Sequence, residues 1–177
     1  MPFNINEMRA KLVGGGARPS LFSVNIFNPV DGRADNDLQF MVKASSIPAS
    51  TLSQIDVPYF GRVMKVAGTR TYEDWSVTVI NDENFSVRAS LEEWSKRINT
   101  YAGNIRDFAS PSPNEYKSTA EVTQYGKTGE ILRVYRFNGL FPLNISQIDL
   151  NWESGNQIEE FQCTFAYDYW NVVGEPG

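Results

Sequence analysis

The 177-residue sequence contains no histidine and only one cysteine, Cys163. Histidine is the commonest general base and the commonest metal ligand, so its absence removes the usual centre of both kinds of site. A single cysteine cannot form a disulfide within the chain. The GxSxG pattern of a nucleophile elbow is missing, and nothing singles out a pair of catalytic carboxylates. We therefore predict that the protein is not an enzyme and has no catalytic residue, cofactor or metal site.

Long hydrophobic runs and excess positive charge are lacking too. No apolar segment approaches the ~20 residues that cross a bilayer, so we expect no membrane partner. Sixteen basic residues stand against 21 acidic ones, which gives a net charge of −5. Such a chain lacks the clustered Lys and Arg that grip phosphates, although a role in which it repels nucleic acid stays open. The glycine run at 14–16 lacks the ending of a phosphate-binding loop, and we interpret it as a flexible joint.

What the sequence does contain is typical of β-structure. Aromatic residues make up 13% of it, and segments of alternating polarity are separated by turn residues. We predict a mainly β fold, a β-sandwich or β-barrel of about eight strands with one α-helix at about 84–99. The helix is indicated by Leu91, Trp94, Ile98 and Tyr101, which recur at helical spacing. Strands are expected at 21–28, 38–44, 62–66, 74–79, 117–125, 130–137, 145–152 and 158–170.

The clearest local pattern is a hairpin expected at 57–82. Its first strand would be 62–66, its turn would fall at Gly68, and its second strand would carry Trp75, Val77 and Val79 on one face. The preceding segment, 45–57, contains Pro48, is followed by Pro58 and is expected to be a long connection, because proline withholds a backbone donor from a sheet.

The chain divides into three parts: an N-terminal arm at 1–20, a single β domain at 21–170 and a C-terminal tail at 171–177. The side chains expected to anchor the core of the domain are Trp75, Val77, Trp94, Phe161 and Phe165. Cys163 alternates with the last two of these, so we interpret it as a buried thiol without a chemical role.

Several short motifs occur in an order that resembles one known family. The first sets are Ala17-Arg18-Pro19 with Leu21-Phe22, and Lys43-Ala44 with Pro48-Ala49. The densest set is Lys65-Val66-Ala67-Gly68, Arg70-Thr71, Asp74-Trp75, Val77-Thr78-Val79 and Asn81-Asp82-Glu83. Glu115-Tyr116-Lys117, Gly139-Leu140-Phe141-Pro142 and the ending Tyr167-Asp168-Tyr169-Trp170 complete the series. Over about residues 17–170 the sequence resembles the tail tube proteins of contractile-tailed bacteriophages.

The resemblance implies a structural virion protein that assembles into hexameric rings. Such rings stack head to tail into a hollow tube inside a contractile sheath, and the genome passes through it during ejection into the host. The implied partners are further copies of the chain, the tail sheath protein, the baseplate hub, a tape-measure protein in the lumen and a tail terminator. DNA would pass transiently, without specific binding. The implied location is the phage tail, with assembly in the host cytoplasm. Tubes of type VI secretion systems and contractile bacteriocins are similar in build.

Two groups of residues follow as candidates for the assembled tube. We expect strands 38–44, 57–66, 117–125 and 130–137 to line the lumen, with Thr119, Glu121 and Thr123 on the wetted face. The alternative is that this face meets the outer solvent. Segment 45–56 and the N-terminal arm are expected to reach the next ring, and deletion of 46–53 should abolish tube growth. The candidates for contacts between subunits are Pro48, Ser50, Arg62, Lys65 and Arg70, although the three basic residues could equally be ordinary solvated charges.

Two other functions remain open from the sequence. A related protein of the baseplate or of tail completion would share the fold but form one ring instead of a polymer. A carbohydrate-binding β-sandwich would instead use exposed aromatic side chains to bind glycans.

Overall fold

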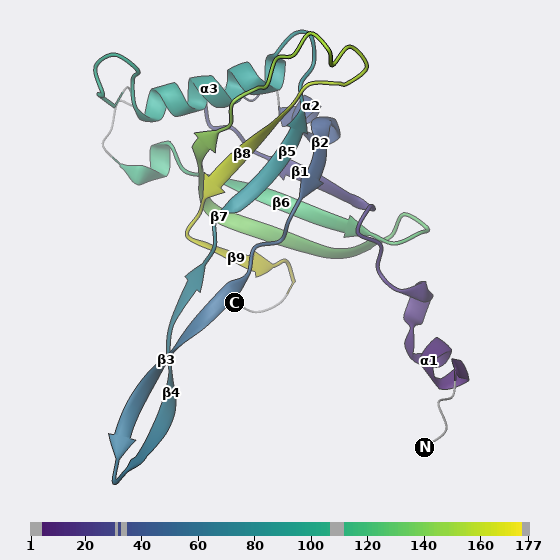
Figure 1. Cartoon of the computed structure of the whole chain (residues 1–177), viewed down its shortest axis with the longest axis vertical. Helices are drawn as coiled ribbons and strands as arrows, with labels where there is room; N and C mark the ends of the chain where they lie inside the picture. Colours follow the sequence, from purple (N-terminus) through teal and green to yellow (C-terminus); the bar gives the residue numbers. More distant parts are fainter. Residues whose placement is uncertain (1–4, 31, 33–34, 107–111, 175–177) are drawn as a thin grey trace.

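The computed structural model describes residues 5–30, 32, 35–106 and 112–174. In these residues the fold is mainly β, with nine antiparallel strands and few helices (Figure 1). The strands are β1 (Phe22–Ile26), β2 (Val42–Ser45), β3 (Ser50–Tyr59), β4 (Arg62–Tyr72), β5 (Trp75–Ile80), β6 (Ser118–Tyr125), β7 (Ile131–Ile145), β8 (Glu160–Ala166) and β9 (Tyr169–Val172). The helices are α1 (Ile5–Lys11), α2 (Asp35–Met41) and α3 (Ser86–Ile98), with short 3-10 turns at Val13–Gly15 and Pro113–Glu115.

Strand β7 holds the body of the subunit together, because it pairs in two sheets. Its first part lies between β6 and β9 in a sheet of order β1-β6-β7-β9, called here the first sheet. Its last part pairs with β8 in the second sheet, of order β7-β8-β5-β2. Gly139 lies between the two parts with a φ of +70°, and the Asp168 side chain occupies the space where a Cβ would stand. Only glycine fits this combination of backbone angle and close approach.

The core lies between the inner faces of the two sheets and under α3. Trp75 of the second sheet stacks on Phe137 of the first, with ring centroids 4.4 Å apart. Helix α3 contributes Trp94, whose indole Nε1 donates to the carbonyl of Tyr116 at 2.9 Å. All five residues predicted as core anchors are buried: Trp75, Val77, Trp94, Phe161 and Phe165.

The body is a sandwich and is not closed into a barrel. Among the described residues, β1 pairs only with β6, β9 only with β7, and β2 only with β5. The backbone groups on the outer sides of these three strands therefore have no partner strand in the subunit. Open edges of this kind are places where a sheet can be extended by another chain.

The sequence predictions for β1, β5, β6 and α3 are confirmed. An acidic residue precedes α3: Asp82 accepts a hydrogen bond from the backbone N–H of Ser86 at 3.2 Å, near the end of the helix where the dipole favours negative charge. The helix at the N-terminus ends before three glycines whose φ angles are all positive. Strand β9 continues to Val172, so the first two residues assigned to the C-terminal tail pair with β7.

The expected hairpin at 57–82 is wrong. Strand β4 runs straight through Gly68 to Tyr72 and pairs with β3, so the turn falls earlier, at Phe60-Gly61. Segment 45–57 is therefore not a plain connection, because most of it belongs to β3. Pro58 is tolerated there since β3 has a partner strand on one side only. Gly68 instead lies opposite Ser53 at a register shift in the ribbon.

The strand expected at 38–44 is also wrong in its first half, which belongs to α2. Asp35 starts this helix and accepts from the backbone N–H of Asn28. Asp37 adds a second acid to the first turn, where the helix dipole favours negative charge. Leu38 is buried and Met41 packs on the core, a spacing of three that suits a helix better than a strand.

Three further strand boundaries differ from expectation. The strand predicted at 130–137 does not end there, because β7 continues through Asn138-Gly139 to Ile145. The segment predicted as a strand at 145–152 is an irregular loop after Ile145, in which Leu150 and Trp152 are exposed. The long strand at 158–170 divides into β8 and β9, because the backbone N–H of Asp168 bonds the carbonyl of Asn138 and turns the chain into the first sheet.

Candidate assembly surfaces

The hairpin of β3 and β4 projects from the body as a two-stranded ribbon (Figure 1). Every residue from 51 to 67 is exposed. Cross-strand pairing places one set of apolar side chains on the same face, and this set is called here the hairpin apolar face: Ile55, Val57, Tyr59, Met64 and Val66. These side chains are between 39% and 70% exposed. An apolar face of this size without a partner in the subunit marks an interaction surface.

The turn at the end of the hairpin has a bulky residue, Phe60, at a position that usually contains a small or polar one. Phe60 has a φ of 44° and Gly61 a φ of 76°, so both central residues adopt the left-handed region. Turns of this kind favour Asn, Asp and Gly at the first position, and a bulky residue there costs about 1 kcal/mol or more. Phe60 is nonetheless 89% exposed, and its ring makes an edge-to-face contact with the neighbouring Tyr59, with ring centroids 4.6 Å apart. We interpret it as a residue kept for a contact outside the subunit.

The predicted contact residues fall into two groups. Arg62, Lys65 and Arg70 are all exposed on β4, and Arg70 donates to the hydroxyl of Ser50 at 2.8 Å. Pro48 is buried, so in the subunit its side chain does not face solvent. The apolar face was not predicted from the sequence, because Pro58 argued against a strand. The alternation of Ile55, Val57 and Tyr59 was the signal that could have revealed it.

Aromatic side chains hold the base of the hairpin against the body. Tyr72, the last residue of β4, lies 6.0 Å from Tyr167 and 6.4 Å from Trp170, measured between ring centroids. The Tyr167 hydroxyl donates to the carbonyl of Glu73 at 2.7 Å. Burial, followed by the nearby Asp74 carboxylate, raises the pKa of Tyr167 to about 12. The phenol therefore stays protonated and able to donate over the whole physiological range.

The outer face of the first sheet is polar. Thr119, Glu121 and Thr123, the predicted lumen residues, share this face of β6. Their cross-strand neighbours on β1, β7 and β9 extend it over four strands: Ser23, Asn25, Val134, Arg136, Asn138, Tyr169 and Asn171. Arg136 pairs with Glu121 at 2.7 Å, so the central charges compensate each other. Thr123 is only 7% exposed, and Glu121 and Thr119 are partly exposed.

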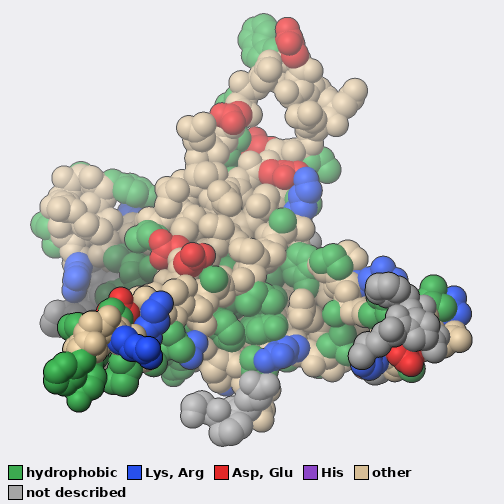
Figure 2. All heavy atoms as spheres, turned by 60° about the horizontal axis from the view of Figure 1, so that its bottom comes forward, with side chains coloured by type: hydrophobic (Ala, Val, Ile, Leu, Met, Phe, Trp, Pro, Cys, Tyr) green, Lys and Arg blue, Asp and Glu red, His purple; other side chains and the backbone are tan. Residues whose placement is uncertain are grey.

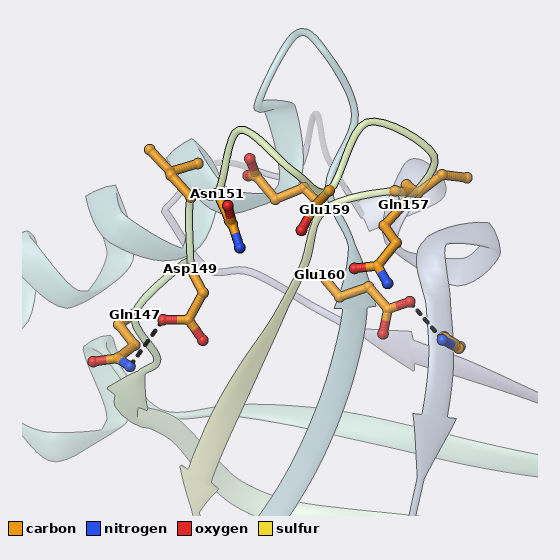
Figure 3. Close-up of a pocket in the computed structure, with 10 residues that line it drawn as sticks. Gln147, Asp149, Asn151, Gln157, Glu159 and Glu160 are labelled. Carbon is orange, nitrogen blue, oxygen red and sulfur yellow. Dashed lines mark hydrogen bonds and ion pairs between the residues drawn. The ribbon is translucent and has the colours of Figure 1, made fainter.

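A groove of about 760 Å³ lies under the loop that joins β7 to β8 (Figure 3). It is bordered by acidic side chains, among them Asp149, Glu159 and Glu160. Glu160 pairs with Lys43 of β2, and Asp149 accepts from the amide of Gln147 at 3.2 Å. The loop also exposes three large apolar residues: Leu150, Trp152 and Ile158.

Chemically reactive groups are few in the described residues. No group of three or more Cys, Asp or Glu side chains is placed there to hold a metal ion. Burial raises the pKa of the Cys163 thiol to about 12, which makes it a poor nucleophile. Among these residues there is also no helix both long and apolar enough to cross a membrane.

The arrangement has known counterparts. The structure aligns with a chain from the cryo-EM structure of an extracellular contractile injection system, the PVC sheath-tube complex in its extended state. The TM-score is 0.66 at 12% identity, and the alignment covers 97% of this chain and 98% of the other. A chain from the anti-feeding prophage baseplate gives a TM-score of 0.64, also at 12% identity, over 89% and 95% of the two chains. The fold is therefore one that contractile injection systems use.

Sequence relatives are more specific. Tail tube protein gp19 of Enterobacteria phage T4 is 36% identical over 163 residues, which cover 92% of this chain and 95% of that protein. The tail tube protein of Serratia phage KSP90 is 27% identical, over 92% and 93% of the two chains. The pattern of the family described as phage tail tube protein matches residues 17–173. The chain belongs to the phage tail tube protein family, which is a family of structural proteins.

Proposed function

We propose that the protein is the tube subunit of a contractile phage tail, without enzymatic activity. Six copies form a ring, and rings stack head to tail into a hollow tube through which DNA leaves the virion. The observation that carries this proposal is the projecting hairpin with its unpartnered apolar face. A heterologous contact that does not close on itself generates a filament, which a tube requires.

The open edges of the first sheet support the ring. Strands β1 and β9 each have one unpaired side, and joining the β1 edge of one subunit to the β9 edge of the next would satisfy those backbone groups. Repeated around an axis, this pairing gives one continuous barrel built from all the first sheets.

The polar face of the first sheet would then line the lumen, with Thr119 and Glu121 in contact with water and Thr123 on the same face but almost fully buried in the subunit. The Glu121–Arg136 pair leaves this face without strong net charge. Such a wall would not bind phosphates tightly, so DNA could slide through it. The partners that follow are the sheath, the baseplate hub, the terminator, and a tape-measure protein that occupies the lumen before DNA. We place the protein in the virion tail after assembly in the host cytoplasm.

Hairpin excision tests the proposal. Residues 54–67 are replaced by Asn-Gly, which closes the shortened ribbon with a favourable two-residue turn. Because these residues are exposed, the free energy of unfolding should change by no more than about 1 kcal/mol. Negative-stain microscopy over a range of concentrations should show hollow tubes for the unaltered chain and none for the excised one. A persistent monomer, or single rings only, from the unaltered chain would contradict a polymeric tube.

A further inference from the structure

In two places the chain passes from one sheet to the other without an intervening helix, and the structure brings these two places together. Strand β7 crosses at Gly139, and the chain crosses back between β8 and β9 at Asp168. The backbone N–H of Asp168 donates to the carbonyl of Asn138 at 2.9 Å, so a hydrogen bond joins the two crossings. The relative direction of the two sheets is therefore decided at this point.

The crossing in β7 is a place at which the strand can bend. Its register with β6 shifts there, so that Gly139 is an extra residue on β7 relative to β6. An extra residue of this kind is a β-bulge, which bends its strand and increases the local twist. Gly139 also lacks a side chain and has a φ of +70°, so its backbone has more freedom than that of other residues of β7. Without further support, the two sheets could swing about this bulge.

An ion pair supports the bulge. The Nζ atom of Lys117, the residue before β6, lies 2.7 Å from Oδ1 and 2.9 Å from Oδ2 of Asp168. The same carboxylate occupies the space beside Gly139 in which a Cβ would stand. It therefore connects the start of β6, the bulge of β7 and the turn between β8 and β9. The three residues Lys117, Gly139 and Asp168 are called here the sheet clip.

The sheet clip lies where a small rotation has a large effect. The first sheet carries the edges β1 and β9 that would close the ring, whereas the hairpin continues into β5 of the second sheet (Figure 1). The angle between the sheets therefore sets the direction of the hairpin relative to the ring. The ten residues of β3 extend about 33 Å. A rotation of about 10° at the base of the hairpin would move its tip by about 6 Å.

We infer that Lys117 is a positioning residue for assembly: its ion pair with Asp168 locks the bulge at Gly139 and fixes the angle between the two sheets. The lock holds every hairpin of a ring in the direction that stacking requires. A partly exposed ion pair contributes little to the stability of a folded chain, so the main effect of this pair is the single geometry that it selects. The inference rests on the proposed function and deepens it, since it assigns the control of stacking to named residues.

Distances between the sheets test the lock in the monomer. Ile131→Cys on β7 of the first sheet and Gln162→Cys on β8 of the second are spin-labelled in one chain, and double electron–electron resonance measures the distribution of distances between them. Both positions are exposed, and Cys163 is buried and should not react. Lys117→Met should broaden the distribution about twofold or more, because the bulge is then free to bend. Lys117→Arg, which retains the ion pair, should leave it narrow.

Lys43→Met is the matched control. Lys43 pairs with Glu160, but both residues belong to the second sheet, so the loss of this pair should not change the angle between the sheets. The melting temperature should fall by no more than about 4 °C in Lys43→Met and in Lys117→Met. A distribution that broadens equally in both variants would overturn the inference, because it would indicate a general loosening of the subunit.

Assembly of the same variants provides a second measurement. Lys117→Met should raise the concentration needed for tubes about fivefold or more, which is the usual size of coupling between distant sites. Single rings should accumulate below that concentration, because the edges that close a ring belong to the first sheet alone. Lys117→Arg and Lys43→Met should form tubes as the unaltered chain does.

The outcomes separate the two proposals. A narrow distance distribution in Lys117→Met, or tubes that form as readily as those of the unaltered chain, overturns the lock and leaves the tube function standing. An unaltered chain that forms no tubes overturns the proposed function. The distance distribution of the monomer still decides in that case whether the ion pair fixes the angle between the sheets.

Discussion

The subunit body and the hairpin both contain strands in which apolar and polar residues alternate. The body buries these apolar side chains, whereas the hairpin exposes them. In β5, Trp75, Val77 and Val79 alternate with polar residues and are at most 1% exposed. In β3, Ile55 and Val57 alternate in the same manner and remain well exposed. Only two residues separate the end of the hairpin from the start of β5. Alternation therefore specifies a strand with an apolar face, but the partner that buries this face can belong to the same chain or to another copy.

The largest contrast is expected from two tryptophans. Trp75→Ala removes the ring stacked on Phe137 and should lower the free energy of unfolding by about 3–5 kcal/mol. Trp152→Ala, at a fully exposed position of the loop, should change it by no more than about 0.5 kcal/mol. Denaturant unfolding of the monomer measures both. Similar losses in the two variants would contradict the division into a stabilising body and a solvent-exposed assembly surface.

Phe60→Asn tests whether the hairpin turn serves assembly at the expense of the stability of the monomer. Asparagine adopts the left-handed region more readily, so the monomer should become more stable by up to about 1 kcal/mol while tube formation is lost. Phe85→Asn is the matched control on the body, because Phe85 has a φ of 54° at the start of α3. It should give a comparable gain in stability and leave tubes intact. Tubes of normal stability from Phe60→Asn would remove the basis for an aromatic anchor.

The smallest effect is expected at the junction between the two regions and depends on pH. The pKa of Tyr167 is raised from 10.0 to about 12, first by burial and then by Asp74. Its contribution to stability is therefore complete below pH 10 and is lost as the pH rises through about 12. Ionisation also removes the donor to the Glu73 carbonyl that holds the hairpin base. Ultraviolet titration of phenolate should show a late step that is missing in Tyr167→Phe, and an unchanged titration in that variant would contradict the assignment.

The strands and helices that the sequence predicted correctly are those whose apolar residues are buried within the chain. The regular spacing of apolar residues in β5 and α3 predicted both elements correctly, because these residues are buried within the chain. Gly68 gave a local turn signal and Pro58 argued against a strand, and pairing of β3 with β4 overrode both. Ile148, Leu150 and Trp152 alternate like a strand, yet the sheet has no neighbour for them. Pairing between distant segments is not visible in one sequence.

The candidate surfaces were predicted only in part. The alternation of β6 predicted that Thr119, Glu121 and Thr123 share one face. The ion pair that balances the charge of Glu121 could not be predicted, because Arg136 belongs to another strand. The basic residues of β4 were identified as contact candidates, whereas the apolar face beside them was missed. The acidic loop was missed because its groove forms only when β2 and β8 bring Lys43 and Glu160 together.

The double role of β7 has a mechanical consequence. A load applied to the hairpin enters β5 directly along the backbone and then passes through β8 into β7, which belongs to both sheets. Hydrogen bonds between strands lie across such a pull, so a whole ladder shares the force at once and no single bond carries it. A push on the hairpin would therefore reach the first sheet through backbone and two hydrogen-bonded ladders, and the subunit body would move as one stiff piece.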